Sequence, residues 1–452
     1  MANLKVGFSS INIDGPLNIG IEGYYVPRYS KGVLDNIEAQ CLAIKLKEKT
    51  VILISVETCM LHKETIDKIA SNIEKTLGIK AENLIMSATH THTAPMIKGV
   101  CFNADPTPLK DYEDFLIEEI TKCAKNSLND LANAKMGYAT GYAPEKVAYI
   151  RRYKMKDGST MTCPPINDPN IDYPLGELDQ RVHVLRFDRE EKESIVLLNY
   201  GVHADTVNGE YVSADWPGWL RKTLDLALDG VKCMVICGAQ GDVGSTNVHP
   251  VPGDMNDTEI SFDNEMKSPG MARFVGRALA GTVLQVYDKV IYTDVDDLDV
   301  YRLTVNAPTN RATEEELVLA HKYKELHESG RDDLIPYTAM ELTTVVAEAL
   351  RMCRFEFGPE FIPLELVGLK IGNVALVGLP GEPFTEIGVE IKKAKGFDLI
   401  LPCALTNGYN GYFPNLSAFS EGGYEAKTSE YKAGVDKLII EGAKTVLDKL
   451  KS

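Results

Sequence analysis

Short apolar runs alternate along this chain with longer segments in which apolar residues recur at helical spacing. Runs such as "TVILISV" (50–56) are typical of buried strands, because they are short, continuous and rich in β-branched residues. After that run, Ile66, Ile69 and Ile73 recur every three to four positions, and Gly78 suits a helix C-terminus. The same reasoning predicts strands within 83–89, 182–188, 194–204, 232–237 and 365–384, and helices near 111–134, 215–228, 313–329, 339–353 and 429–450.

The order of these elements mixes strand–helix units with hairpins. "VHVLRFD" and "SIVLLNYGVHA", for example, are joined by a charged turn and predict paired strands. We therefore expect an α/β fold in which mixed β-sheets are covered by helices. No internal repeat or linker-like stretch is evident, so we treat 1–452 as one domain. The stretches 141–180 and 246–270 have weak periodicity and are expected to be long functional loops.

Composition narrows the possible partners. With 44% hydrophobic and 25% charged residues, the 452-residue chain has a globular composition. Its formal charge of −17 argues against nucleic acid and anionic membrane surfaces as partners. No apolar run approaches the roughly 18–20 residues of a membrane-spanning helix, and the start does not resemble a signal peptide. The nine cysteines are odd in number and form no CxxC pair, so we expect reduced thiols and a cytoplasmic protein.

The stretch "ATHTHTAP" (88–95) places two histidines at the end of a predicted strand. In an extended chain, residues two apart point to the same side, so His90 and His92 should face one site. They could be two ligands of one metal, a ligand beside a proton-transfer group, or polar residues of a turn. The spacing alone does not separate these alternatives.

Other predicted strands also end in polar residues. His203 ends "LLNYGVHAD", Glu382 lies in "PGE", Asp242 and Ser245 follow "MVIC", and the loop "GYNGY" carries tyrosines. Ligands and catalytic groups of α/β proteins gather at strand ends. Imidazoles, a carboxylate and a phenol could hold a catalytic zinc ion with one position open to water. Alternatively, "PGE" is only an exposed turn and "GYNGY" only a hairpin. The HxHxDH and HExxH zinc motifs are absent.

Five segments together resemble one enzyme family: "SATHTHTAP", "NYGVHAD", "CGAQGDVGSTN", "GLPGEPFTEIG" and "TNGYNGYFPN…GGYEA". In order and character they are similar to the zinc-amidase domain of the neutral, non-lysosomal ceramidases. The likeness extends from about residue 5 to about residue 430, and it is specific only as a set. It implies a ceramidase-like catalytic domain that contains zinc and hydrolyses an N-acyl bond.

The resemblance also implies roles for individual residues. It makes His90, His203, Glu382 and Tyr412 the zinc ligands, and His92 a proton-transfer group. Four further residues are implied around the scissile bond: Tyr424 as the group that polarises the carbonyl, Arg151 (with Arg152 as a possible substitute) as the nearby arginine, and Ser245 as the counterpart of a family serine.

The sequence departs from the family pattern at that serine. Where the family has "GDVSPN", this chain reads "GDVGSTN", so either Gly244 replaces the serine or Ser245 takes its place one residue later. Zinc-activated water remains compatible with both. The chain also shows neither the secretion signal nor the C-terminal immunoglobulin-like domain of full-length ceramidases, which weakens the expectation of membrane ceramide more than that of amide hydrolysis.

We therefore expect a zinc-dependent amidohydrolase that acts on a small-molecule N-acyl substrate, without nucleic-acid partners or stable membrane insertion. One alternative is a zinc esterase or deacetylase that acts on a small soluble metabolite. The other is a metal-retaining binding protein without catalysis.

Overall fold

Three β-walls surround a shared apolar core in the computed structural model, which describes residues 4–98, 107–251 and 267–451. The first two walls belong to one nine-stranded sheet, and the third is a separate four-stranded sheet. The first wall contains β1 (Leu4–Asn12), β3 (Glu38–Leu46), β4 (Lys49–Val56) and β5 (Leu84–Ala88). The second contains β6 (Ala132–Tyr142), β11 (Arg181–Arg189), β12 (Ile195–Tyr200), β14 (Lys232–Cys237) and β16 (Ile291–Thr293). The third contains β17 (Leu298–Pro308), β18 (Phe361–Ile371), β19 (Val374–Gly378) and β21 (Leu399–Cys403).

The nine-stranded sheet turns a corner between its two walls. β1 and β6 pair only through Lys5–Asn133 and Val6–Ala132, whereas β1 and β3 pair along their full length. Beyond that corner the inner faces of all three walls contribute leucines, isoleucines and valines to one buried cluster. The two walls also approach each other at their far sides, where the Ser55 hydroxyl of β4 donates a 2.7 Å hydrogen bond to the Val235 carbonyl of the edge strand β14.

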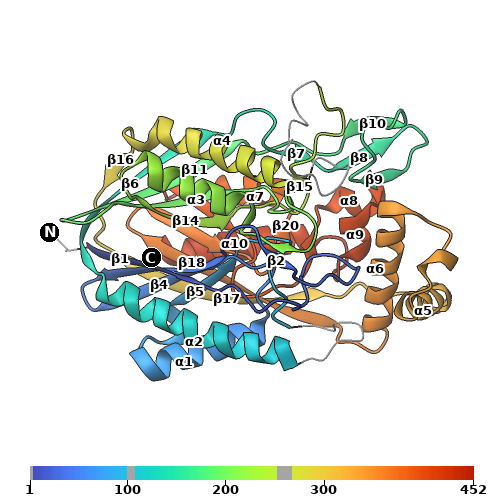
Figure 1. Cartoon of the computed structure of the whole chain (residues 1–452), viewed down its shortest axis with the longest axis horizontal. Coiled ribbons are helices and arrows are strands. Elements are labelled where there is room, and N and C mark those ends of the chain that lie inside the picture. The colour runs from blue at the N-terminus through green and yellow to red at the C-terminus, as the bar shows by residue number, and fades with distance from the viewer. Residues whose placement is uncertain (1–3, 99–106, 252–266, 452) are drawn as a thin grey trace.

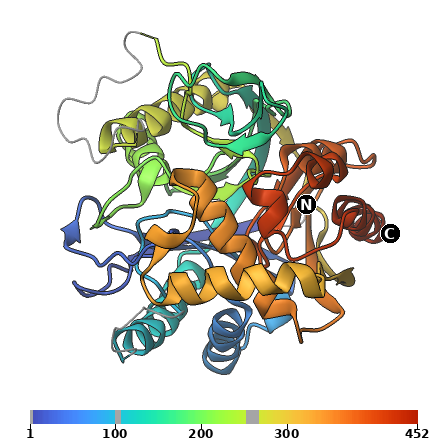
Figure 2. The same ribbon diagram turned by 90° about the vertical axis from the view of Figure 1, so that its right-hand side faces the viewer.

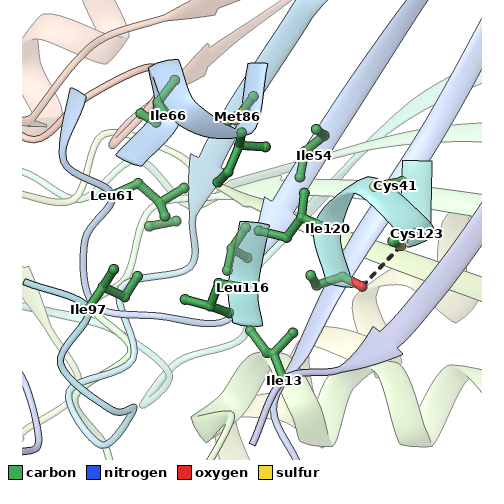
Figure 3. Close-up of a cluster of buried hydrophobic side chains, with 14 of the residues drawn as sticks. Ile13, Cys41, Ile54, Leu61, Ile66, Met86, Ile97, Leu116, Ile120 and Cys123 are labelled. Atoms are coloured by element: carbon green, nitrogen blue, oxygen red, sulfur yellow. Dashed lines mark hydrogen bonds between the residues drawn. The ribbon is translucent and has the colours of Figure 1, made fainter. Parts of the chain in front are cut away.

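A pair of helices covers the outside of each wall, as the end-on view in Figure 2 shows. The pairs are α1 (Lys63–Leu77) with α2 (Thr107–Asn129), α3 (Asp215–Ala227) with α4 (Pro269–Tyr287), and α7 (Thr385–Lys392) with α10 (Val435–Lys451). Under α1 and α2, Leu116 and Ile120 pack against Ile54 of β4 (Figure 3). Such side chains stabilise the fold by roughly 1.5–3 kcal/mol each when fully buried. The same cluster includes Ala88 and Ala94, so it anchors the histidine-bearing segment between them.

The remaining elements lie mostly toward one end of the three walls (Figure 1). They are β2 (Gly32–Val33), η1 (Ala81–Asn83), β7 (Tyr149–Ile150), β8 (Arg152–Met155), β9 (Thr160–Thr162), β10 (Ile171–Pro174), β13 (Tyr211–Val212), β15 (Val243–Gly244), α5 (Glu314–Glu328), η2 (Asp332–Leu334), α6 (Ala339–Phe355), β20 (Glu382–Pro383), β22 (Tyr412–Phe413), α8 (Leu416–Glu421) and α9 (Tyr424–Thr428).

The corner brings together strand ends that a flat sheet would separate. Going across the sheet from β5 to β12, five of the neighbouring strand pairs are antiparallel. In a flat sheet β5 and β12 would therefore run in opposite directions. Neighbouring strands twist by roughly 20–25° relative to each other, and the corner adds a further turn. Together these rotations bring β5 and β12 to similar directions in space. The carboxyl ends of β5, β12 and β14 therefore meet, and the Cys237 thiol at the end of β14 contacts the Thr89 carbonyl after β5.

The predicted α/β architecture with mixed sheets covered by helices is confirmed. Three predicted boundaries are wrong, the first being the helix start expected at residue 111, which lies at Thr107. The helix expected at 111–134 ends at Asn129, because residues 132–134 already pair in β6, and the last helix begins at Val435 instead of residue 429. Cys101 and much of the predicted loop 246–270 lie outside the described residues. Among the described helices, none has the length and hydropathy to cross a membrane.

Candidate active site

His90 lies directly after β5 in a backbone conformation that few side chains adopt. Its φ is +67°, and its peptide N–H donates to the Thr58 carbonyl at 2.9 Å. Strained residues of this kind cluster at functional sites. The ring Nδ1 lies 2.7 Å from the Cys59 carbonyl oxygen, which can only accept a hydrogen bond. Nδ1 therefore carries the proton, and the lone pair of Nε2 points away from the strand.

His203 is held in the same way by a different segment. The turn that follows β14 presents two carbonyls to its Nδ1, those of Gln240 at 3.0 Å and Val243 at 2.9 Å. Nε2 is again left with its lone pair. A carbonyl behind each histidine is the usual arrangement around a metal-binding imidazole, because it fixes the tautomer and the ring plane.

Both lone pairs face the carboxylate of Glu382, which is fully buried. Its Oε2 lies 3.1 Å from His90 Nε2 and 3.0 Å from His203 Nε2. Since both Nδ1 atoms hold the protons, three acceptor atoms converge, and Glu382 Oε2 has no hydrogen-bond donor among the described residues. A bound metal ion would satisfy these converging atoms. Without one, a proton on His90 serves the same purpose, because Glu382 outweighs burial and raises the pKa of His90 well above its ordinary value. Two imidazoles and one carboxylate form the donor set that catalytic zinc uses, so the residues fit the ion that the resemblance implies.

Two tyrosines of "GYNGY" flank the carboxylate. β20 and β22 pair in parallel with Glu382 and Tyr412 as register partners, so their side chains leave the same face. The Tyr409 hydroxyl donates a 3.2 Å hydrogen bond to Glu382 Oε1. Tyr412, the phenol implied as a ligand, accepts a 3.0 Å hydrogen bond from Arg151.

The structure separates the two arginines. Arg151 reaches the site: Nη1 lies 3.2 Å from His203 Nε2, Nη2 donates to the Gly241 carbonyl at 2.8 Å, and Nε donates to Glu425 at 2.7 Å. Burial opposes the charge of Arg151, but Tyr412 and Glu425 outweigh it and raise the pKa well above its ordinary value. Arg152 points away, toward Glu421 and the Gly422 carbonyl. Arg151 therefore lines the site, and Arg152 is structural.

His92 lies beside the three clustered groups but is not one of them. Its Nε2 is 3.2 Å from His90 Nε2, whereas its ring centroid is 5.9 Å from that of His203. Two groups of possible donor atoms share His90: one adds His203 and Glu382, and the other adds Cys59 and His92. Only the first contains a carboxylate together with two imidazoles, the donor set of catalytic zinc. Burial lowers the pKa of His92 well below its ordinary value, and the opposing charge of Asp205 does not reverse this shift, so the ring is neutral at pH 7.

Ser245 lines a small cavity of about 30 Å³ beside His203 and Arg151, enough for one or two water molecules. Gly244 belongs to β15, and a Cβ built there would meet Arg151 at an ordinary 3.7 Å. The backbone therefore has room for a serine at 244, but the hydroxyl of this chain lies one residue later.

Tyr424 begins α9, and its ring packs 5.6 Å from that of Tyr412. Burial raises the pKa of Tyr424 well above its ordinary value, with Tyr25 and Tyr412 adding to the shift. Its hydroxyl thus stays protonated and can donate to a carbonyl oxygen.

Sequence reasoning missed three residues of this region: Asp205, Lys267 and Tyr24. The Tyr24 hydroxyl and the Lys267 ammonium both contact the Asp205 carboxylate. The two-residue spacing in "HAD" could have indicated Asp205, because the same spacing indicated His92 beside His90. No local signal marks Tyr24 or Lys267.

Comparisons with known proteins agree on the fold. No family model matches the sequence, and a comparison with curated proteins gives no match. Among solved structures, neutral ceramidase from Pseudomonas aeruginosa is similar at a TM-score of 0.70 and 16% identity, covering 99% of this chain and 75% of that one. A structure described as "Ceramidase complexed with C2" is similar at a TM-score of 0.69 and 15% identity, covering 99% and 76%. The ceramidase-like fold expected from the sequence is thus confirmed.

Proposed function

We propose that this chain, which has the fold of the neutral ceramidases, is a zinc-dependent amidohydrolase that cleaves an N-acyl bond in a small-molecule substrate. One observation carries the proposal: His90, His203 and Glu382 converge as buried acceptors from three separate segments, and each imidazole is fixed by a backbone carbonyl. Tyr412, on the same face as Glu382, is the proposed fourth ligand. When bound, zinc would supply a Lewis acid that polarises a carbonyl and lowers the pKa of water toward neutrality.

The surrounding residues supply the remaining roles. His92 is neutral and adjoins the cluster, so it can accept a proton from water and return it to the departing amine. Tyr424 and Arg151 both adjoin Tyr412 and are protonated donors, so they can stabilise the negative charge that develops on the carbonyl oxygen. Ser245 lines the adjoining cavity and has no assigned covalent role.

The test begins with purified protein that is stripped by a chelator and then reloaded with zinc. N-acyl sphingoid bases, N-acyl amino acids, N-acetyl sugars and simple esters are offered separately, and the release of amine or alcohol is measured. We expect stoichiometric zinc and zinc-dependent release of amine. His90→Ala should abolish both, whereas His321→Ala, at an exposed histidine of α5, should preserve both.

Protein that binds no zinc, or zinc-loaded protein that releases no amine from any substrate, would contradict the proposal. Release of alcohol from esters alone would favour the esterase alternative.

A further inference from the structure

The ring of His92 is held from several sides by the loop that follows β1. The Arg28 guanidinium donates a 2.7 Å hydrogen bond to the His92 carbonyl and stacks 4.0 Å from the centre of the Tyr24 ring. That tyrosine ring contacts the His92 imidazole edge to face, with centroids 5.6 Å apart. The Gly23 backbone lies so close to the ring that a side chain at this position would not fit, since a Cβ built there would lie 2.7 Å from His92 Nδ1. These contacts fix where the imidazole lies, but they provide no hydrogen bond to either ring nitrogen.

Asp205 is the carboxylate that faces the back of this ring. Its Oδ1 lies 3.8 Å from His92 Nδ1, and that nitrogen has no hydrogen-bond partner among the described residues. Hydrogen bonds of catalytic histidines are often long before metal and substrate bind, and they tighten afterwards. The opposite nitrogen, Nε2, faces the zinc ligands. Asp205 and the candidate zinc site therefore lie at opposite ends of the same imidazole.

The Asp205 carboxylate is itself held by two donors. Lys267, directly before α4, contributes its ammonium 2.8 Å from Oδ2 and 2.8 Å from the Tyr24 hydroxyl, and the Tyr24 hydroxyl donates to Oδ1. All three side chains are largely buried. A buried carboxylate with two fixed donors cannot rotate freely, so Oδ1 stays directed toward His92.

We propose that Asp205, held by Tyr24 and Lys267, is the positioning residue for His92: it accepts the Nδ1 proton and so presents the Nε2 lone pair to the reacting water. The inference rests on the proposed hydrolytic function and adds the group that selects the tautomer of its proton carrier. Without that acceptor, the ring can place its proton on Nε2, and it can then no longer accept one there.

The kinetic test compares Asp205→Asn with wild type after both are loaded with zinc. We expect unchanged zinc content, a KM within about twofold, and a fall in kcat of about 10²- to 10⁴-fold, the usual range for losing proton transfer or its correct tautomer. Asp225→Asn, at an exposed aspartate of α3, is the matched control and should retain kcat. An unchanged kcat in Asp205→Asn would overturn the proposal, as would a loss of kcat that follows loss of zinc.

Two further measurements do not depend on the folding of that variant. Tyr24→Phe removes one of the two donors to Asp205, so kcat should fall by about tenfold at constant zinc content. In wild type labelled with ¹⁵N in its imidazoles, His92 should carry its proton on Nδ1, with the signal assigned by its absence in His92→Gln. A proton on Nε2 would overturn the inference. The ring spectrum does not require turnover, so a wild type that lacks activity would contradict the hydrolytic function without deciding this point.

Discussion

Replacing Glu382 by glutamine tests whether the buried acceptor cluster holds a cation. Oε2 of Glu382 faces the Nε2 atoms of His90 and His203 at 3.1 and 3.0 Å. A zinc ion bound between these three atoms should stabilise the native state. At free zinc a thousandfold above Kd, binding stabilises the native state by about 4 kcal/mol. With an unfolding entropy of about 2.1 cal/mol/K per residue, a chain of 452 residues should gain about 4 °C in Tm.

The glutamine variant should behave differently in two ways. Its amide keeps an oxygen that can accept from Tyr409, but it supplies N–H donors in place of a charged acceptor. Zinc should therefore no longer raise Tm. In excess chelator, the variant should unfold below wild type, because the amide removes the buried charge that pairs with His90 when no metal is bound.

The assay is thermal unfolding followed by circular dichroism, with wild type and variant each measured in chelator and across a zinc titration. Metal content is determined on the same samples. Glu386→Gln, at an exposed glutamate of α7 that bonds Asn415, is the matched control and should keep the zinc-dependent rise. The reasoning is refuted if zinc leaves the Tm of wild type unchanged, or if Glu382→Gln responds to zinc as wild type does.

Other substitutions test separate parts of the structure. Arg151→Lys keeps a charge but loses the guanidinium fork, so kcat should fall about 10²-fold in a substrate-hydrolysis assay, and an unchanged kcat would exclude its role at the carbonyl. Ser245→Ala should leave kcat unchanged, whereas loss of activity and mass spectrometry showing an acyl adduct on wild-type Ser245 would establish a serine nucleophile instead. Asp179→Asn should destabilise the fold by about 2–3 kcal/mol at pH 7 in urea unfolding, because Arg181 and Lys392 both bond this carboxylate. Burial raises the pKa of Asp179, but those two cations outweigh it and hold the pKa well below the ordinary 3.8. The stabilisation is therefore present above about pH 4 and is lost as the pH falls through the folded-state pKa. A stability difference between wild type and Asp179→Asn that persists unchanged at low pH would contradict this assignment.

Local sequence patterns determined the elements and several candidate residues. Periodicity was sufficient for the strand ending before His90 and for the helix ending at Gly78, because each depends on the residues nearby. It was insufficient at residues 132–134, where pairing with β1 and then β11 extends a strand into what the pattern predicted as helix. Long-range pairing overrides local preference at such boundaries.

The grouping of the site was decided by tertiary structure. Sequence alone could align His90 with His92, since they are two residues apart, and the structure adds the grouping of His90 with His203 and Glu382. That grouping depends on the corner of the large sheet, which brings the carboxyl ends of β5 and β12 together although an odd number of antiparallel pairs separates them. Tyr24 and Lys267 are invisible in sequence for the same reason: they act through Asp205, and their proximity to it arises only when segments far apart in the chain are folded against one another.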